Sequence, residues 1–179
     1  MLVSTALGAQ FTSGGLSVVT HSVSPHDRQQ TDTYYIVAHF HYVLFGGALF
    51  GIFAGIYFWY PKVFGQLLNE KLGKVRFWMW FVGFNMTFGP MHILGLQGMP
   101  RRIYTYPEGS GWDFWNAVSS VGAFVLAAAL LVFFANIRMT DRKHKREGIK
   151  VAGDPWDARS LEWSLPSPTP EYKIGRAHG

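Results

Sequence analysis

Two histidines, His39 and His41, lie two residues apart in a long apolar stretch without charged residues. On an α-helix, residues at this spacing point about 200° apart around the axis. The two imidazoles would therefore face opposite sides of one helix and serve two sites rather than one shared metal. Neutral imidazole is a common ligand of metals and of haem iron. The spacing thus favours one helix that supplies a ligand to each of two cofactors.

The simpler alternative for either histidine alone is a hydrogen bond to a neighbouring membrane helix. Two histidines at this spacing, flanked by aromatic residues in YYIVAHFHY at 34–42, make that alternative less attractive. Ionisable side chains inside a membrane are rare and are retained mostly for function.

A second group of polar residues flanks the apolar stretches. Arg101 and Arg102 directly follow an apolar stretch at 77–100, and Asp27 and Asp32 precede the apolar stretch at 33–61 that contains the two histidines. Guanidinium groups bind carboxylates through paired hydrogen bonds, so the arginines could hold the carboxylates of an embedded cofactor. Together with the aspartates, they would form a polar cluster able to hold protons or an ion. The alternative is a solvated arginine pair at a membrane interface.

The distribution of charge predicts the elements that position these residues. The chain has 179 residues, 49% hydrophobic and 15% charged, whereas average globular proteins carry about a quarter charged residues. Residues 33–61, 77–100 and 114–137 contain no Asp, Glu, Lys or Arg, and each run exceeds the roughly 20 residues that cross a bilayer. A fourth apolar run covers residues 1–19. We predict an all-α integral membrane bundle of four transmembrane helices, at about 1–19, 33–60, 77–98 and 112–138.

Basic residues predict how the bundle is oriented. They concentrate between the second and third spans and after the last span, whereas the other two links carry only Arg28, Arg101 and Arg102. The positive-inside rule places the basic-rich segments on the cytoplasmic side. Residues 141–179 are thus predicted to form a cytoplasmic tail, first basic and then proline-rich, with little regular structure from Val151 onward. Because topology explains these basic runs, we expect no nucleic-acid binding.

Two further features limit which bonds and metal sites are possible and indicate where the chain begins. The absence of cysteine excludes disulfides and thiolate metal sites. Met1 opens directly into apolar sequence with no basic region before it, so we expect the chain to begin inside a helix, as a fragment would.

Six segments resemble, in order along the chain, parts of one protein family. Residues 32–43 (DTYYIVAHFHYV) closely resemble the tenth-helix signature of haem–copper oxidase subunit I. Residues 11–16 (FTSGGL) resemble its ninth helix, and residues 85–90 (NMTFGP) and 98–102 (GMPRR) resemble its eleventh helix and the following loop. Residues 154–163 (DPWDARSLEW) and 166–170 (PSPTP) resemble its bacterial tail. The resemblance implies the C-terminal third of a twelve-helix subunit of an aa-type oxidase.

The resemblance also implies roles for individual residues. His39 corresponds to the ligand of the high-spin haem, where oxygen is reduced, and His41 to a ligand of the low-spin haem, which relays electrons. Phe40 lies between them, and Arg101 and Arg102 correspond to the arginines that hold haem propionates.

Three other positions acquire roles in the same way. Asp27 corresponds to an acid near the propionates of the high-spin haem, Tyr34 to a hydroxyl near those of the low-spin haem, and Asp32 to a ligand of a non-redox magnesium ion.

The chain departs from the family pattern at two positions. Many relatives carry histidine directly before Asp32, where this chain has Thr31, so magnesium binding would need another ligand, with His21 and His26 as candidates. Phe45 replaces a serine that contacts a haem side chain in some relatives. The ligands of the copper ion (copper B), the cross-linked tyrosine, the second ligand of the low-spin haem and the proton-channel residues come from earlier helices of the family, outside this chain.

These resemblances imply a catalytic subunit that reduces oxygen to water with electrons from cytochrome c and pumps protons, with two haems that we expect to be haem A. The expected partners are the N-terminal part of subunit I, the copper-bearing subunit II and other subunits, cytochrome c and membrane lipid, in a bacterial inner membrane. The chain alone is expected to be inactive. A quinol oxidase is the alternative within the superfamily, and a nitric oxide reductase fits less well. A cofactor-free structural membrane protein is the alternative from another class.

Overall fold

A computed structural model describes residues 2–148 and 151–169, and within them the chain is helical. In chain order its elements are α1 (Leu2–His21), α2 (Ser24–Gln30), α3 (Tyr34–Phe40), the π-helix η1 (His41–Gly46), α4 (Gly47–Phe64), α5 (Glu70–Leu96), α6 (Asp113–Glu147) and the short 3₁₀ helix η2 (Leu161–Ser164). The described residues form no β-sheet, and a single isolated bridge joins Thr33 to Pro100. The predicted all-α class is confirmed.

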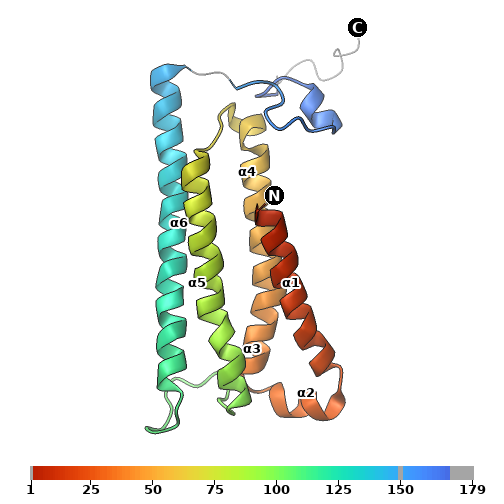
Figure 1. The fold of residues 1–179 in the computed structure, drawn as a ribbon, viewed down its shortest axis with the longest axis vertical. Coiled ribbons are helices and arrows are strands. Elements are labelled where there is room, and N and C mark those ends of the chain that lie inside the picture. Colours follow the sequence, from red (N-terminus) through yellow and green to blue (C-terminus); the bar gives the residue numbers. More distant parts are fainter. Residues whose placement is uncertain (1, 149–150, 170–179) are drawn as a thin grey trace.

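The long helices run side by side as an up-and-down bundle (Figure 1). α6 packs along α5, α5 contacts α3, and α1 lies against η1 and α4. At one end of the bundle, α2, the start of α3 and the 97–112 link come together. At the opposite end lie the 65–69 link, the end of α6 and the tail. Asp32 and the two arginines are therefore at the end of the bundle opposite to the basic segment that follows the last predicted span.

Two helical rods are long and apolar enough to cross a membrane. They are the continuous rod Tyr34–Phe64, with 31 residues, and Asp113–Glu147, with 35 residues. At about 1.5 Å per residue, both exceed the roughly 30 Å of a hydrocarbon layer. Both agree with predicted spans. The other two spans, which correspond to α1 and α5, stay predictions.

Helix boundaries differ from those predicted because local capping, rather than hydropathy, ends each helix. The helix predicted to stop before Pro61 continues to Phe64, where Gly65 adopts a left-handed conformation (φ 64°) and its amide bonds to the Pro61 carbonyl at 2.8 Å. α5 begins at Glu70 because the Asn69 side chain accepts hydrogen bonds from the first-turn amides. α6 continues through its basic last turns to Gly148, whose φ is 61°.

Small residues allow the helices to approach closely. A Cβ at Gly122 on α6 would lie 2.6 Å from Thr87 Oγ1 on α5, and one at Gly14 on α1 would lie 2.7 Å from a Val43 methyl on η1. The Ser119 hydroxyl donates to the Thr87 carbonyl at 2.8 Å across the α5–α6 contact. An aromatic core lies among α4, α5 and α6. It includes Phe50, Phe53, Phe77, Trp80, Phe84, Phe88 and Phe133.

The described part of the tail has little regular structure, as its composition predicts, but aromatic residues attach it to the end of α4. Trp163 is only 3% exposed and packs edge-to-face on Phe58, with ring centroids 5.1 Å apart. The Lys62 ammonium donates to the Leu165 carbonyl at 2.6 Å, and the Trp156 indole donates to the Phe58 carbonyl at 2.9 Å.

Trp163→Ala should release this part of the tail. Truncating a buried tryptophan removes about 3–5 kcal/mol of packing, which exceeds what two tail-to-helix hydrogen bonds contribute at about 1 kcal/mol each. Hydrogen exchange followed by mass spectrometry should show faster exchange across residues 151–169 and little change in α6. Leu161→Ala, at a side chain 78% exposed in the same short helix, is the matched control. Equal exchange in both variants would contradict this anchoring role.

Candidate functional site

His39 lies near the end of α3 and faces α1. Its Nδ1 lies 2.6 Å from Ser17 Oγ and 3.2 Å from the Gly14 carbonyl oxygen. The Ser17 hydroxyl donates its own hydrogen to the same Gly14 carbonyl at 2.7 Å, so it accepts at His39. Because both oxygens near His39 Nδ1 act as acceptors, we assign the proton of the neutral imidazole to Nδ1. Nε2 then carries a lone pair.

His41 begins η1 and has a different set of neighbours. Its Nδ1 donates to the Val37 carbonyl one turn earlier, at 2.7 Å. The ring stacks on Phe88 of α5 at 4.2 Å with an interplanar angle of 16°, and the Phe40 ring lies 4.5 Å away. Since a carbonyl can only accept, the same tautomer is assigned and Nε2 again carries the lone pair.

The two imidazoles are thus arranged as their two-residue spacing predicts, one toward α1 and one toward α5. In the described part of the chain, every hydrogen bond to either ring uses Nδ1. A carbonyl or hydroxyl at Nδ1 is the usual support for a histidine that binds a metal through Nε2. The described residues contain no cluster of three or more His, Cys, Asp or Glu that could share one metal ion. The donor set therefore fits two separate haem irons, each of which one imidazole would hold.

The π-helix that starts at His41 was not predicted. η1 spans His41–Gly46 between two α-helical segments, and Tyr42 and Gly46 are buried within it. Single π-turns inside α-helices occur often at functional sites, because the inserted residue changes the direction of the side chains around it. Hydropathy has the same sign through both kinds of helix, so the sequence pattern carries no signal for this change.

Two more histidines lie beside the site and were not predicted as part of it. The His21 ring centroid is 5.1 Å from that of His39, and His21 Nδ1 bonds to the Ser17 carbonyl at 2.7 Å. The His92 ring lies edge-on to Tyr35 at 5.1 Å and to Tyr42 at 5.3 Å. The sequence predicts His21 only as a candidate magnesium ligand and assigns no role to His92, which is a single histidine on α5.

At the start of α3, backbone pairing joins the 97–102 segment to the residues before His39. The Tyr34 amide donates to the Met99 carbonyl at 3.0 Å, and the Arg101 amide donates to the Asp32 carbonyl at 2.9 Å. The Arg101 side chain donates from Nε and Nη2 to Asp32 Oδ1, at 3.2 and 2.9 Å. These contacts fix Arg101 beside the N-terminus of the histidine helix.

The other two members of the predicted polar cluster are not joined to this pair. Asp27 Oδ1 accepts from the Thr31 hydroxyl at 2.8 Å. Arg102 is exposed, with a left-handed backbone (φ 65°), and has no ion pair within the described residues. The structure therefore brings together Arg101 and Asp32 but not the full set of two acids and two arginines.

The predicted magnesium site is not assembled by the described residues. The Asp32 side chain is 90% exposed and its carboxylate is bound by Arg101. His21 is directed toward His39 and Tyr35 instead. Magnesium needs several oxygen ligands in octahedral geometry, so this carboxylate would require ligands from outside these residues. Magnesium binding at Asp32 stays a prediction.

Residues 1–125 match the sequence model of the family described as Cytochrome C and Quinol oxidase polypeptide I. The chain is 44% identical over 176 residues to the cytochrome c oxidase subunit 1 of Alkalihalophilus pseudofirmus, covering 98% of this chain and 28% of that protein. It is also 44% identical over 173 residues to the quinol oxidase subunit 1 of Bacillus subtilis, covering 96% of this chain and 26% of that protein.

The fold is similar to that of a solved haem–copper terminal oxidase dimer, with a TM-score of 0.64 and 22% identity over 94% of this chain and 29% of that one. The chain spans little more than a quarter of the length of the curated relatives it matches. With the family sequence model covering residues 1–125, the chain belongs to the cytochrome c and quinol oxidase polypeptide I family, the subunit I family of the haem–copper oxidases.

Proposed function

We propose that this chain supplies one imidazole ligand to each of two haems in subunit I of a respiratory terminal oxidase. The observation that supports this most strongly is the arrangement of His39 and His41. Both rings are held at Nδ1 by protein oxygens, and they lie against different helices. In this proposal His39 binds the high-spin haem and His41 the low-spin haem.

The residues around each imidazole hold it for this task. Ser17 and the Gly14 carbonyl hold the His39 ring from α1, and the Val37 carbonyl holds the His41 ring from within its own helix. An acceptor at Nδ1 fixes the tautomer and raises the basicity of Nε2 as a ligand. Bound haem iron supplies the redox chemistry, which is electron relay at the low-spin site and oxygen reduction at the high-spin site.

The other residues whose roles the family resemblance implies would support the two haems. Phe40 lies between the two imidazoles in sequence and contacts His41. Arg101 and Arg102 hold propionates, and Tyr34 and Asp27 lie near them. Of these, Arg101 has the most defined geometry, because its ion pair with Asp32 fixes it at the start of the histidine helix.

For the complete complex, we propose reduction of oxygen to water with electrons from cytochrome c, coupled to proton pumping. Its cofactors would be two haems of the A type and copper B, whose ligands lie outside this chain. The proposed partners are the N-terminal part of subunit I, a copper-bearing subunit II and the other subunits. The proposed location is a bacterial inner membrane, with residues 141–179 on the cytoplasmic side. In this proposal the chain alone is inactive.

A quinol oxidase is the second candidate, because the similarity to quinol oxidase subunit 1 of Bacillus subtilis is as high as that to a cytochrome c oxidase subunit. Both would keep the two histidines. The purified complex separates the two candidates when reduced cytochrome c and a quinol are supplied in turn as electron donors. Oxygen uptake with cytochrome c alone supports the first proposal, and uptake with quinol alone supports the second. A purified complex without haem absorbance would contradict both.

Ser17→Ala should weaken the ligand strength of His39 without removing the haem. The 2.6 Å contact is lost and the 3.2 Å contact to the Gly14 carbonyl remains, and loss of such a supporting bond typically costs about 10–100-fold in affinity or activity. Resonance Raman spectroscopy should show a lower iron–histidine stretching frequency for the reduced high-spin haem. Ser13→Ala, at an exposed serine on the same helix whose hydroxyl donates to the Ala9 carbonyl at 2.9 Å, is the control. An unchanged frequency would mean that Ser17 does not support the ligand.

A further inference from the structure

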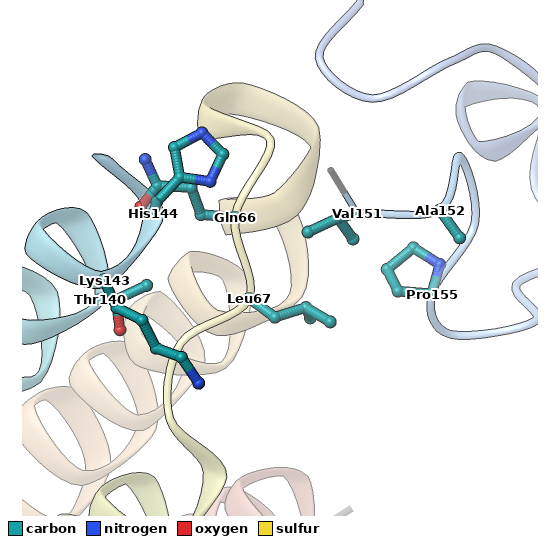
Figure 2. A pocket seen from close by; sticks show the side chains of 8 residues that line it. All are labelled: Gln66, Leu67, Thr140, Lys143, His144, Val151, Ala152 and Pro155. Atoms are coloured by element: carbon teal, nitrogen blue, oxygen red, sulfur yellow. The ribbon is translucent and has the colours of Figure 1, made fainter. Parts of the chain in front are cut away.

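A cavity of about 380 Å³ lies at the basic end of the bundle, away from the histidine site. Figure 2 shows it between the 65–69 link, the last turns of α6 and the first residues of the tail. Its walls include Gln66, Leu67, Thr140, Lys143, His144 and Pro155. In this view Lys143 and His144 extend from α6, and the tail residues stand on the opposite side.

The length of α6 places this cavity at the depth of lipid headgroups. The helix has 35 residues, about 52 Å at 1.5 Å per residue, and its uncharged run ends before Arg138. Thr140 and His144 lie two and six residues beyond Arg138, which is about 3–9 Å further along the axis. Headgroup layers occupy roughly the outer 5–8 Å on each side of the hydrocarbon. This depth depends on α6 as a membrane span and not on haem binding by the histidines.

The polar groups in the cavity can bind both an anion and a hydroxyl. Lys143 has a loose ion pair with Glu147, with 3.8 Å between the charged atoms, and its side chain is 66% exposed, so its hydrogen-bond donors are available. His144 adds a ring N–H donor beside it. Gln66 lines the cavity, and its Oε1 is buried and has no hydrogen-bond partner in the described structure. A rotation of its side-chain amide toward the cavity would let this oxygen accept from a ligand hydroxyl.

The surroundings of the cavity favour a negatively charged lipid. Five basic residues lie between positions 138 and 147, against two acids, Asp141 and Glu147. Basic clusters directly beside a membrane span attract anionic headgroups. Leu67, Val151 and Pro155 give the cavity an apolar lining, which suits the glycerol backbone and first methylene groups of a phospholipid.

We propose that this cavity binds the headgroup of an anionic, hydroxyl-bearing phospholipid of the phosphatidylglycerol type. Lys143 and His144 bind the phosphate, and Gln66 Oε1 accepts from a headgroup hydroxyl. The lipid would fill the space between α6 and the tail and hold the tail against the end of the bundle.

The test is lipid retention by the complete complex in nanodiscs that contain phosphatidylglycerol and phosphatidylcholine. After detergent washing, native mass spectrometry counts the phosphatidylglycerol molecules that remain bound. The double variant Lys143→Ala, His144→Gln should lose at least about tenfold of the retained lipid at this site, because charge-assisted hydrogen bonds are the strongest contacts that the cavity offers.

Lys145→Ala is the matched control, with the same charge change two residues along the helix. Lys145 pairs tightly with Asp141 at 2.9 Å and does not line the cavity, so retention should change less than twofold. Equal loss in both variants would overturn the site and leave only a diffuse attraction of lipid to a basic surface.

A second measurement tests the part assigned to Gln66. The wild-type complex should retain phosphatidylglycerol several-fold more than phosphatidylmethanol, which has the same charge without a hydroxyl, and Gln66→Leu should remove that preference. Displacement of the retained lipid by millimolar inorganic phosphate would instead identify a site for free anions. That result, or a wild-type complex that retains no lipid or shows no preference, would overturn the proposal. Haem absorbance of each variant verifies that the complex has assembled.

Discussion

We expect His39→Ala to abolish oxygen reduction in the assembled complex while the low-spin haem spectrum persists. His39 is held from α1 by Ser17 and Gly14, whereas His41 is held by Val37 and lies against Phe88 of α5. Because the two imidazoles share no supporting contact among the residues that the structure describes, removing one leaves the other ligand in place. Oxygen uptake should fall to the assay background, and optical spectra should lose the high-spin features alone.

His41→Ala should give the complementary result. The absorption of the low-spin haem should disappear, and ligand-binding spectra with carbon monoxide should still detect the high-spin haem. His26→Ala, at an exposed histidine in α2, is the control for the loss of an imidazole and should leave both spectra unchanged. If either single variant removed both haem signals from a complex that still assembles, the assignment of one ligand to each haem would be wrong.

The separation of the two sites could be predicted from the sequence because it depends only on helical periodicity. Any regular helix through His39 and His41 directs them toward different neighbours. The contacts that support them could not be predicted in this way. Ser17 lies 22 residues before His39 and reaches it only because α1 packs on α3 and η1, and nothing in the spacing along the chain indicates that pairing.

The boundaries of the elements show the same limit. Charge-free runs predict where apolar helix can lie, but they do not predict where the helix ends. Asn69 starts α5 well before its apolar run begins, and Gly148 ends α6 well after its apolar run has ended. The change to a π-helix at His41 cannot be predicted from composition or from hydropathy.

For the tail, composition predicts the secondary structure but not the packing. Its prolines and polar residues predict little regular structure, and η2 is indeed a single short helix. Two tryptophans of the tail, Trp156 and Trp163, nevertheless have partners at the end of α4. A proline-rich segment can therefore be fixed by a few large apolar side chains, without secondary structure of its own.

Arg101→Gln should lower the midpoint potential of the nearby haem, because it removes a positive charge that favours the reduced form. A charge that favours the reduced form by about 1.4 kcal/mol raises the potential of a one-electron couple by about 59 mV. The Arg101 side chain is 25% exposed, so solvent screening should reduce the shift to about half of that value. Redox titration of both haems measures it.

The ion pair with Asp32 gives this prediction a compensating variant. Asp32→Asn removes a negative charge from the same place and should raise the potential, and the double variant should return it close to that of the wild type. Arg28→Gln, at an exposed arginine on α2 at the same end of the bundle, controls for a general change in surface charge. Arg101→Lys should cause a smaller fall than glutamine, since it keeps the charge but loses the paired hydrogen bonds. If Arg101→Gln and Arg28→Gln left both potentials unchanged, Arg101 would be a solvated interface residue that bonds to Asp32 and to nothing else.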